Sequence, residues 1–374
     1  MASSSFSKLP STASSSIEPF TIDFPESEFQ QLLDLLKLTP LPSQSYENSL
    51  PNGDRHLGLR LDWLSQAKKK WETDFDWRQV EGHLNSFPNF KAQVDDKLGT
   101  FSIHFAALFS AKPNAIPVLM LHGWPGYTFS TLPSSPLTDF DAADCARVLD
   151  TLVTSVLSFP AYVVQGGDVG SRVARVMGAE HSACIAVHLN MCSMSQPTDN
   201  RIRHPISETE KQGLRRLEEW KATGTAYAME HATRPATIGA VLASNPVALL
   251  AWIGEKFLDW TDKDPTIQTI LEHVTLYWLT KCMHTNLWSY RHSYGPAAKP
   301  HDHPDWHLKK PLGYSYFPKE LIPIPVAWVA TTGNLVQSAV HETGGHFAAM
   351  EEPEALLKDV EEFVNLVWRR ETGL

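Results

Sequence analysis

The sequence predicts an α/β fold in which a parallel sheet carries an inserted helical cap and follows a set of N-terminal helices. Two observations support this prediction. Apolar runs typical of buried parallel strands occur before residue 194, stop, and resume after residue 301. Between these blocks the apolar residues recur at helical spacing. We therefore expect a core at 90–193 and 302–374, with a cap at 194–301.

The chain ahead of the core is expected to be a tail followed by a helical meander. Residues 1–18 contain few apolar side chains that could be buried, and they are predicted to be disordered. Within the meander, at 19–89, the segment SEFQ at 27–30 fits a capping box that opens a helix through Leu36. A second amphipathic helix is expected at 60–73.

Strand and helix patterns then follow in order along the core and the cap. Strands are predicted at 90–94, 101–107, 115–121, 162–164, 183–189, near 313 and at 325–331, with core helices at 139–157 and 353–368 and cap helices at 208–221, 246–260 and 266–280. The run at 115–121 is apolar apart from its proline. We expect it to be a buried parallel strand.

Composition indicates a globular protein with a sizeable core, built as one large domain or two small ones. The chain has 374 residues, 43% of them hydrophobic, and a net charge of −10, which argues against a nucleic-acid surface. Its four cysteines are far apart and form no CxxC, so we expect them to be reduced and buried. No signal-peptide core or run of transmembrane length is present, which favours a soluble cytoplasmic protein.

The segment 162–178, YVVQGGDVGSRVARVMG, is the most informative stretch of the sequence. A β-branched run, a glycine-rich turn and an amphipathic stretch give the strand–turn–helix context of a nucleophile elbow. Gly166 and Gly170 permit the tight turn, and Asp168 occupies its apex. A carboxylate there is ionised at neutral pH and could attack an sp3 carbon to form an ester. The alternative is an Asx turn that only joins strand to helix.

An ester on Asp168 would need a base to activate water and an acid to orient that base. His346 lies in a glycine-containing loop before the last helix, and Glu320 lies just past an expected strand. The order nucleophile, acid, histidine is the one found in α/β-hydrolases. Taken alone, each of these two residues would be interpreted as an ordinary loop residue.

Seven motifs occur in a fixed order from about residue 20 to 368. They are HGWPG (122–126), QGGDVGS (165–171), HLNM (188–191), ASNPVALLAWIGEKF (243–257), LYWLT (276–280), GYSYFPKE (313–320) and GGHFAAMEEPE (344–354). Together they make the chain similar to the microsomal-type epoxide hydrolases of fungal style. The resemblance implies an α/β-hydrolase core with a helical cap and an N-terminal helical meander.

The resemblance also implies roles for individual residues. Asp168 stands where the family has its nucleophile, Glu320 where it has the acid and His346 where it has the base. Tyr227, in the segment GTAY, and Tyr290, in the segment WSYR, match the two cap tyrosines of such a site. These phenols would donate to the epoxide oxygen while the carboxylate attacks from the opposite side.

Two backbone N–H groups, those of Trp124 and Val169, match the oxyanion hole that serves the hydrolysis of the ester. The expected product is a vicinal diol, and no cofactor is implied. The expected partners are a small apolar epoxide and water, without nucleic acid or a transmembrane anchor. A homodimer is compatible with the resemblance, although the sequence does not define the oligomeric state.

The segment HDHPDWH at 301–307 invites interpretation as a metal site because it groups His301, His303 and His307 with two aspartates. Prolines are interleaved there, so we favour an exposed connecting loop and predict no metal site.

The chain departs from the family pattern directly after Gly126. Relatives continue through a helix and a strand before a YTFS-like segment, whereas here Tyr127 follows at once. We therefore expect one core helix and one core strand to be missing, which would open the middle of the sheet. Val169 is a second departure, because relatives carry Trp there; its backbone donor is retained.

Epoxide hydrolysis is the leading hypothesis, and two alternatives remain. The missing segment motivates a catalytically impaired relative that binds an apolar ligand beneath the cap. Haloalkane dehalogenation would use the same aspartate chemistry. The paired tyrosines favour the epoxide, because indole or amide N–H groups stabilise a departing halide better.

Overall fold

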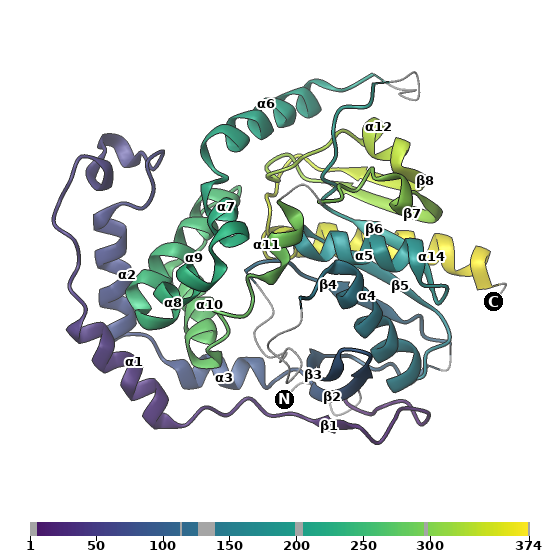
Figure 1. Cartoon of the computed structure of the whole chain (residues 1–374), viewed down its shortest axis with the longest axis horizontal. Helices are drawn as coiled ribbons and strands as arrows, with labels where there is room; N and C mark the ends of the chain where they lie inside the picture. The colour runs from purple at the N-terminus through teal and green to yellow at the C-terminus, as the bar shows by residue number, and fades with distance from the viewer. Residues whose placement is uncertain (1–5, 113, 126–138, 199–204, 295–297, 373–374) are drawn as a thin grey trace.

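The computed structural model describes residues 6–372 except 113, 126–138, 199–204 and 295–297. Its main sheet has five parallel strands in the order β4-β5-β6-β7-β8 (Figure 1). These strands are β4 (Val118–Leu121), β5 (Tyr162–Gly166), β6 (Cys184–Leu189), β7 (Leu308–Tyr316) and β8 (Gly333–Val340). Every residue of β5 is buried, as expected for an inner parallel strand that is covered on both faces.

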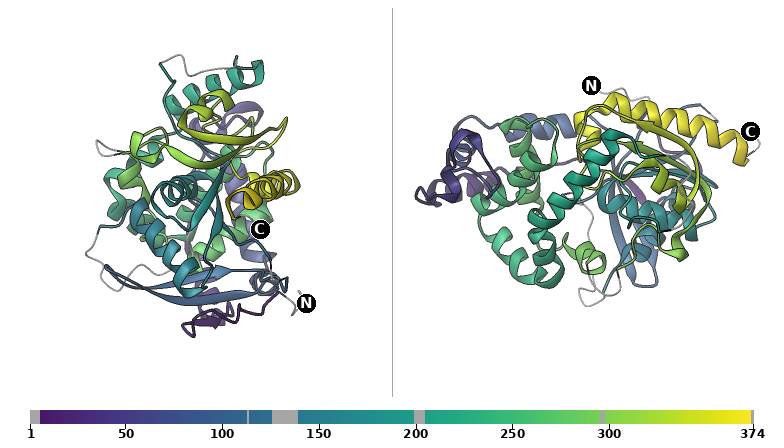
Figure 2. Two further views of the ribbon diagram at one scale, coloured as in Figure 1. Left: turned by 90° about the vertical axis from the view of Figure 1, so that its right-hand side faces the viewer. Right: turned by 90° about the horizontal axis from the view of Figure 1, so that it is seen from above.

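Helices cover both faces of the main sheet. The helices α4 (Ala142–Thr151) and α5 (Asp168–Glu180) lie on one face, and α14 (Pro353–Thr372) lies on the other (Figure 2). The short helices α12 (Val326–Val329) and α13 (Ala348–Glu351) complete this part of the chain. The strand expected at 325–331 was wrong: α12 occupies it, and β8 follows at Gly333. Pro325 precedes the first turn of α12, where a missing N–H costs nothing.

A second sheet is separate from the first. It contains β1 (Ile17–Pro19), β2 (Asn89–Asp96) and β3 (Gly99–Ala106), which pair antiparallel in that order. Strands are therefore present at both predicted positions, 90–94 and 101–107. Among the described residues no strand joins β3 to β4, so the two sheets each end in an open edge.

The open edge changes the burial of β4. We expected a buried parallel strand at 115–121, but Val118 is 38% exposed and Met120 is 55% exposed. A strand with only one neighbour leaves half of its backbone groups and much of its side-chain surface uncovered. This exposure is the consequence expected if an inner strand is missing. The junction of Gly126 with Tyr127 lies outside the described residues.

The N-terminal region contains α1 (Glu26–Leu38), α2 (Leu61–Thr73) and α3 (Trp77–Leu84). Both predicted helices are present; α1 begins after Pro25, without a side-chain cap from Ser27. The prediction of a disordered tail was wrong for the described residues 6–18. They are held by backbone hydrogen bonds to the core, such as Ser14 N to Val156 O (2.8 Å), which pair backbone groups that would otherwise need water.

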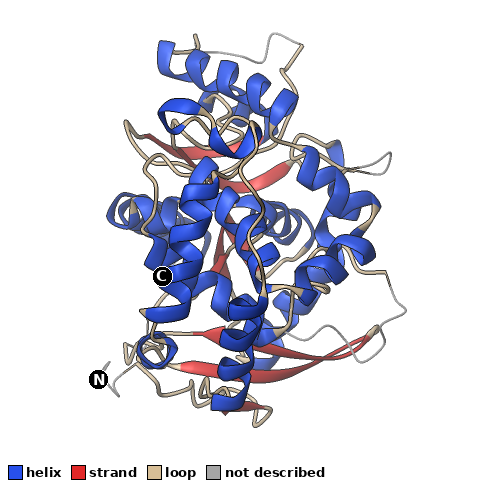
Figure 3. Ribbon diagram, turned by 90° about the vertical axis from the view of Figure 1, so that its left-hand side faces the viewer, coloured by secondary structure: helices blue, strands red, loops and turns tan. Residues whose placement is uncertain are grey.

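In the described part of the chain between β6 and β7, six α-helices form the cap. They are α6 (Glu208–Thr223), α7 (Ala226–Thr233), α8 (Pro235–Ser244), α9 (Pro246–Trp260), α10 (Ile267–Thr280) and α11 (Trp288–Ser293). The start of α9 is fixed by Asn245, whose side chain accepts from Val247 N and Ala248 N, and by Pro246 in the first turn. Seen from the cap side, helices fill the foreground and the strands lie behind them (Figure 3).

One hydrophobic cluster joins the N-terminal helices to the cap and reaches the end of the sheet. It contains Trp71 of α2, Leu250 of α9, Trp124 and both cap tyrosines, Tyr227 and Tyr290. Within the described chain no single helix is long and apolar enough to cross a membrane. Among the described helices, α8 and α9 reach that length and composition only when taken together, and they are bent by 115°.

Candidate active site

Asp168 lies at a sharp turn between β5 and α5, where its φ is +49°. This left-handed conformation is unusual for a residue with a side chain and is typical of strained functional turns. The turn also brings the side chain against a neighbouring loop, since a Cβ at Gly123 would lie 2.0 Å from Asp168 Oδ1. The predicted strand–turn–helix is therefore present, and Asp168 is at its apex.

The parallel pairing of β4 with β5 brings the loops that follow these two strands close together. Leu121, the last residue of β4, pairs with Gly166 at the end of β5. The loops after the two strands consequently start at the same edge of the sheet. The backbone N–H of Trp124 donates to Asp168 Oδ1 over 2.7 Å. The backbone N–H of Val169 is also among the groups that lower the pKa of this carboxyl group, so both predicted oxyanion donors lie beside Asp168.

His346 lies between the other two predicted members of the site. Its Nε2 is 3.4 Å from Asp168 Oδ2, and its Nδ1 is 2.6 Å from Glu320 Oε1. Glu320 follows the end of β7 and His346 follows the end of β8, so parallel strands again bring distant residues to one edge. The structure thus brings together Asp168, His346 and Glu320.

The three ionisable groups shift one another's pKa. Burial alone would lower the pKa of His346, but the adjacent Glu320 and Asp168 outweigh burial and raise that pKa to about 10. Burial would raise the pKa of Asp168, whereas the hydrogen bonds from His346 and from two backbone N–H groups lower it. Asp168 is therefore ionised at neutral pH and His346 carries a proton beside it.

Tyr227 of α7 and Tyr290 of α11 meet above the elbow. Their ring centroids are 5.7 Å apart and the rings meet edge to face. Burial is the main reason why the pKa of each phenol is raised well above 10, and the nearby charge of Asp168 raises it further. Both phenols therefore keep their protons and can donate them. The indole of Trp124 stacks on Tyr227, with centroids 5.7 Å apart.

Several residues that no sequence motif indicated as functional hold Trp124, Tyr290 and His346 in place. His231 contacts the rings of Trp124 and Tyr290 at 4.6 and 4.7 Å, and its Nε2 accepts from Trp252 Nε1 over 3.0 Å. Burial lowers the pKa of His231 to about 3, so it remains neutral. The carbonyl of Trp260 accepts from the backbone N–H of His346 over 2.9 Å. Trp252 and Trp260 lie in or just beyond the motif at 243–257, which was the available signal.

The histidine-rich segment at 301–307 differs in part from the prediction. His301 is buried rather than exposed, and its Nε2 is 2.9 Å from the hydroxyl of Ser171 on α5. A buried imidazole needs hydrogen-bond partners, and this hydroxyl supplies one. Within the described part of the chain no group of three His, Cys, Asp or Glu side chains could hold a metal ion. All four cysteines are free and buried, as expected.

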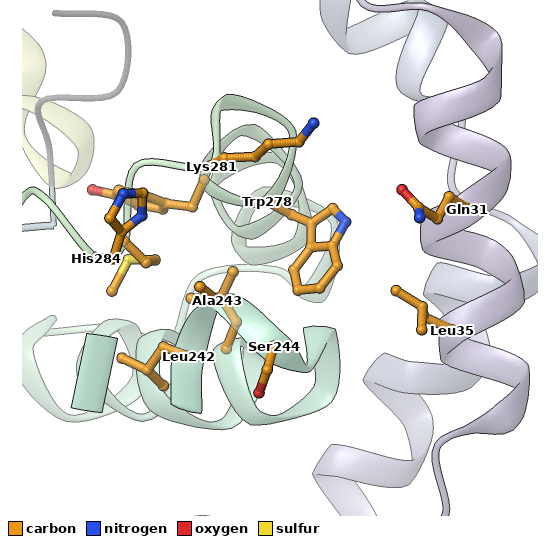
Figure 4. A pocket seen from close by; sticks show the side chains of 11 residues that line it. Gln31, Leu35, Leu242, Ala243, Ser244, Trp278, Lys281 and His284 are labelled. Atoms are coloured by element: carbon orange, nitrogen blue, oxygen red, sulfur yellow. The ribbon is translucent and has the colours of Figure 1, made fainter. Parts of the chain in front are cut away.

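A separate cavity of about 410 Å³ lies between α1 and the cap (Figure 4). It is lined by residues such as Leu35, Leu242, Trp278 and Lys281. No predicted site residue lines it, so this cavity is distinct from the site at Asp168.

Comparison with known proteins places the chain in a family. The family model for the epoxide hydrolase N terminus matches residues 17–131. A Dothistroma septosporum relative is 40% identical over 397 residues, covering 97% of this chain and 93% of its own length. The chain belongs to the epoxide hydrolase family. Epoxide hydrolase 1 of Oryctolagus cuniculus is 28% identical over 426 residues, covering 95% of this chain and 90% of its own.

The solved structure of Aspergillus niger epoxide hydrolase superimposes with a TM-score of 0.90 at 41% identity, covering 97% of this chain and all of that one. This match confirms the predicted α/β-hydrolase fold. The alignment with the Dothistroma relative also bears on chain length. Since 97% of 374 residues is about 363, about 34 of its 397 positions have no counterpart in this chain. This number of residues is enough for one helix and one strand.

Proposed function

We propose that this epoxide hydrolase family member opens its substrate through a covalent ester on Asp168. The observation that carries the proposal is the 3.4 Å approach of His346 Nε2 to Asp168 Oδ2, with Glu320 2.6 Å from the other ring nitrogen. This arrangement provides a nucleophile, a base for the second step and an acid that orients the base.

In the first step an oxygen of Asp168 attacks an epoxide carbon and the C–O bond of the ring breaks. The strained ether has a poor leaving group, so its oxygen needs a proton as the bond breaks. Tyr227 and Tyr290 supply hydrogen bonds and a proton from the cap side. Because both phenols remain protonated, they are competent donors across the neutral range.

In the second step water attacks the carbonyl carbon of the ester and releases the diol. Esterification removes the negative charge of Asp168, which is one of the groups that raise the pKa of His346. The imidazolium then loses its extra proton more readily, and this proton can return through solvent to the phenolate left by the first step. The neutral imidazole takes a proton from the attacking water, while Glu320 stabilises the imidazolium that forms, and this imidazolium protonates the diol oxygen as the ester bond breaks. The N–H groups of Trp124 and Val169 stabilise the oxyanion, a contribution of about 10² to 10³ in rate per donor.

The aromatic surroundings of Asp168 fit a small apolar epoxide, and the proposed product is a vicinal diol. Water is the second substrate, and the side chains and backbone N–H groups described above supply the chemistry. A cytoplasmic location and a homodimer remain part of the proposal, to be tested by cell fractionation and by sedimentation. The comparisons support epoxide hydrolysis and offer no support for dehalogenation or for a binding-only role.

A single turnover in heavy-oxygen water tests the proposal, with enzyme in excess over styrene oxide. Water attacks the ester carbonyl, so the label should enter the carboxyl group of Asp168 and be found in the peptide that contains it. Label in the diol after the first turnover, with none in Asp168, would overturn the proposal. A halide-release assay with bromoalkanes should remain negative.

A further inference from the structure

Lys256 is a buried cation that the mechanism above does not use. It lies on α9, and only 4% of the residue is exposed. Its Nζ is 4.6 Å from the ring centroid of Tyr227, 5.3 Å from that of Trp252 and 6.0 Å from that of Trp260. Lysine is among the residues that are least often fully buried, so the burial of Lys256 against Tyr227 needs an explanation.

The charged groups around Lys256 are few. Its Nζ is 3.1 Å from Glu255 Oε1, and the negative charge of Asp259 also acts on it; both acids lie on the same helix. On the facing helix α7 lie Tyr227 and His231, and the latter is neutral. Burial lowers the pKa of Lys256, while Glu255 and Asp259 oppose that change.

The two tyrosines differ in their position relative to this cation. The ammonium of Lys256 lies over the ring of Tyr227, whereas the cation–ring contacts of the described residues include none over the ring of Tyr290. Negative charge that develops on a phenol as the epoxide oxygen takes its proton is therefore better stabilised on Tyr227. An ammonium near the face of a ring is attracted to the ring, and the attraction grows as the phenol becomes anionic.

We propose that Lys256 is a positioning residue that acts through Tyr227: its ammonium holds the ring and stabilises the negative charge that forms there when Tyr227 protonates the opening epoxide. The proton passes from the Tyr227 hydroxyl to the epoxide oxygen as the C–O bond breaks. Lys256 exchanges no proton in this step. The inference rests on the proposed function of Tyr227 as an acid.

The proposal predicts a separation of the two chemical steps. Ester formation uses Tyr227 and should depend on the charge at position 256, whereas ester hydrolysis uses His346 and should not. In the variant Lys256→Met we expect the single-turnover rate constant of ester formation to fall about tenfold or more, the typical effect of weakening a general acid. The rate constant of ester hydrolysis should stay within about twofold of wild type. Equal losses in both steps would indicate a merely structural role and overturn the proposal.

The pH profile provides a second test that does not require Lys256→Met to fold. In the wild type, ester formation should slow at high pH as Lys256 loses its proton. In Lys256→Arg the rate should be largely retained and the high-pH decline should move upward, because guanidinium keeps its charge. In Glu255→Gln the decline should move to lower pH, since the partner carboxylate is lost. A profile that is the same in all three proteins would contradict the proposal.

Lys281→Met is a matched control, because Lys281 is also in the cap but is 68% exposed and pairs with Glu28. It should leave both rate constants unchanged. The covalent ester is measured in each protein by mass spectrometry. If the wild type forms no ester on Asp168, the proposed function itself fails. If the ester forms at the wild-type rate in Lys256→Met, only the inference about Lys256 fails.

Discussion

Nε2 of His346 lies 3.4 Å from Oδ2 of Asp168, close enough for an ion pair but on the side of the ring away from Glu320. The two ring nitrogens thus face two different carboxylates. One of these, Asp168, loses its charge when it becomes an ester, and the other keeps it. This asymmetry allows the histidine to be protonated at rest and to act as a base only after ester formation.

Replacing His346 by Gln should uncouple the two steps. Glutamine cannot deprotonate water, so ester hydrolysis should slow by about 10² to 10⁴, whereas ester formation on Asp168 should continue. Intact-protein mass spectrometry should show the enzyme accumulating the mass of one substrate molecule. Asp168→Asn serves as the control and should gain no mass. Free diol produced by the His346→Gln variant at the wild-type rate would contradict the proposed role of this histidine.

The pKa of His346 also predicts a pH dependence of stability. Its pKa is raised from 6.5 to about 10 in the folded protein because Glu320 and Asp168 outweigh the opposing effect of burial. The stabilisation from this group is therefore complete below about pH 6.5 and is lost as the pH rises through about 10. Urea unfolding between pH 6 and pH 10 should show a falling free energy of unfolding. In Glu320→Gln this decline should be weaker, and an equally steep decline would count against the assignment.

The cap tyrosines should affect only the first step. Tyr227→Phe and Tyr290→Phe should each reduce the rate constant of ester formation by about 10-fold to 10²-fold, because the remaining phenol still donates to the oxygen. The double variant should lose more than either single variant, and its loss need not equal the sum of the two free-energy changes. Rapid-quench measurement of the ester checks this. A double variant that forms the ester as fast as wild type would exclude both phenols as donors.

The open edge of β4 predicts that the chain can be stabilised by an insertion. A chimera in which the residues that follow the counterpart of the 122–126 motif in the Dothistroma relative are inserted between Gly126 and Tyr127 should cover Val118 and Met120. We expect its unfolding midpoint to rise by about 5 °C or more, as the burial of additional apolar area would produce. A Gly/Ser insertion of equal length is the control and should not raise the midpoint. Equal midpoints for the two insertions would show that the edge does not accept a strand.

Much of this fold could be predicted from local patterns. The strand–turn–helix at 162–178 is specified by β-branched residues, small residues around Asp168 and an amphipathic run, which all act over short distances. The placement of β8 could not be predicted, because 325–331 is as apolar as a strand and only its packing makes part of it the helix α12. The order of tail residues 6–18 likewise depends on hydrogen bonds to a core far away in sequence.

The sequence by itself determined which residues carry the chemistry: Asp168 at its turn, His346 and Glu320 after it, and two cap tyrosines named through family motifs. Only the tertiary structure decided which atoms meet, including the contact of Lys256 with Tyr227 and the open edge of β4. The identity of each residue determines which chemical group it carries, and the spacing of neighbouring residues determines the local backbone conformation. Distances between groups that are far apart in sequence, and the pKa shifts that follow from those distances, arise only when parallel strands end at one edge and the cap closes over it.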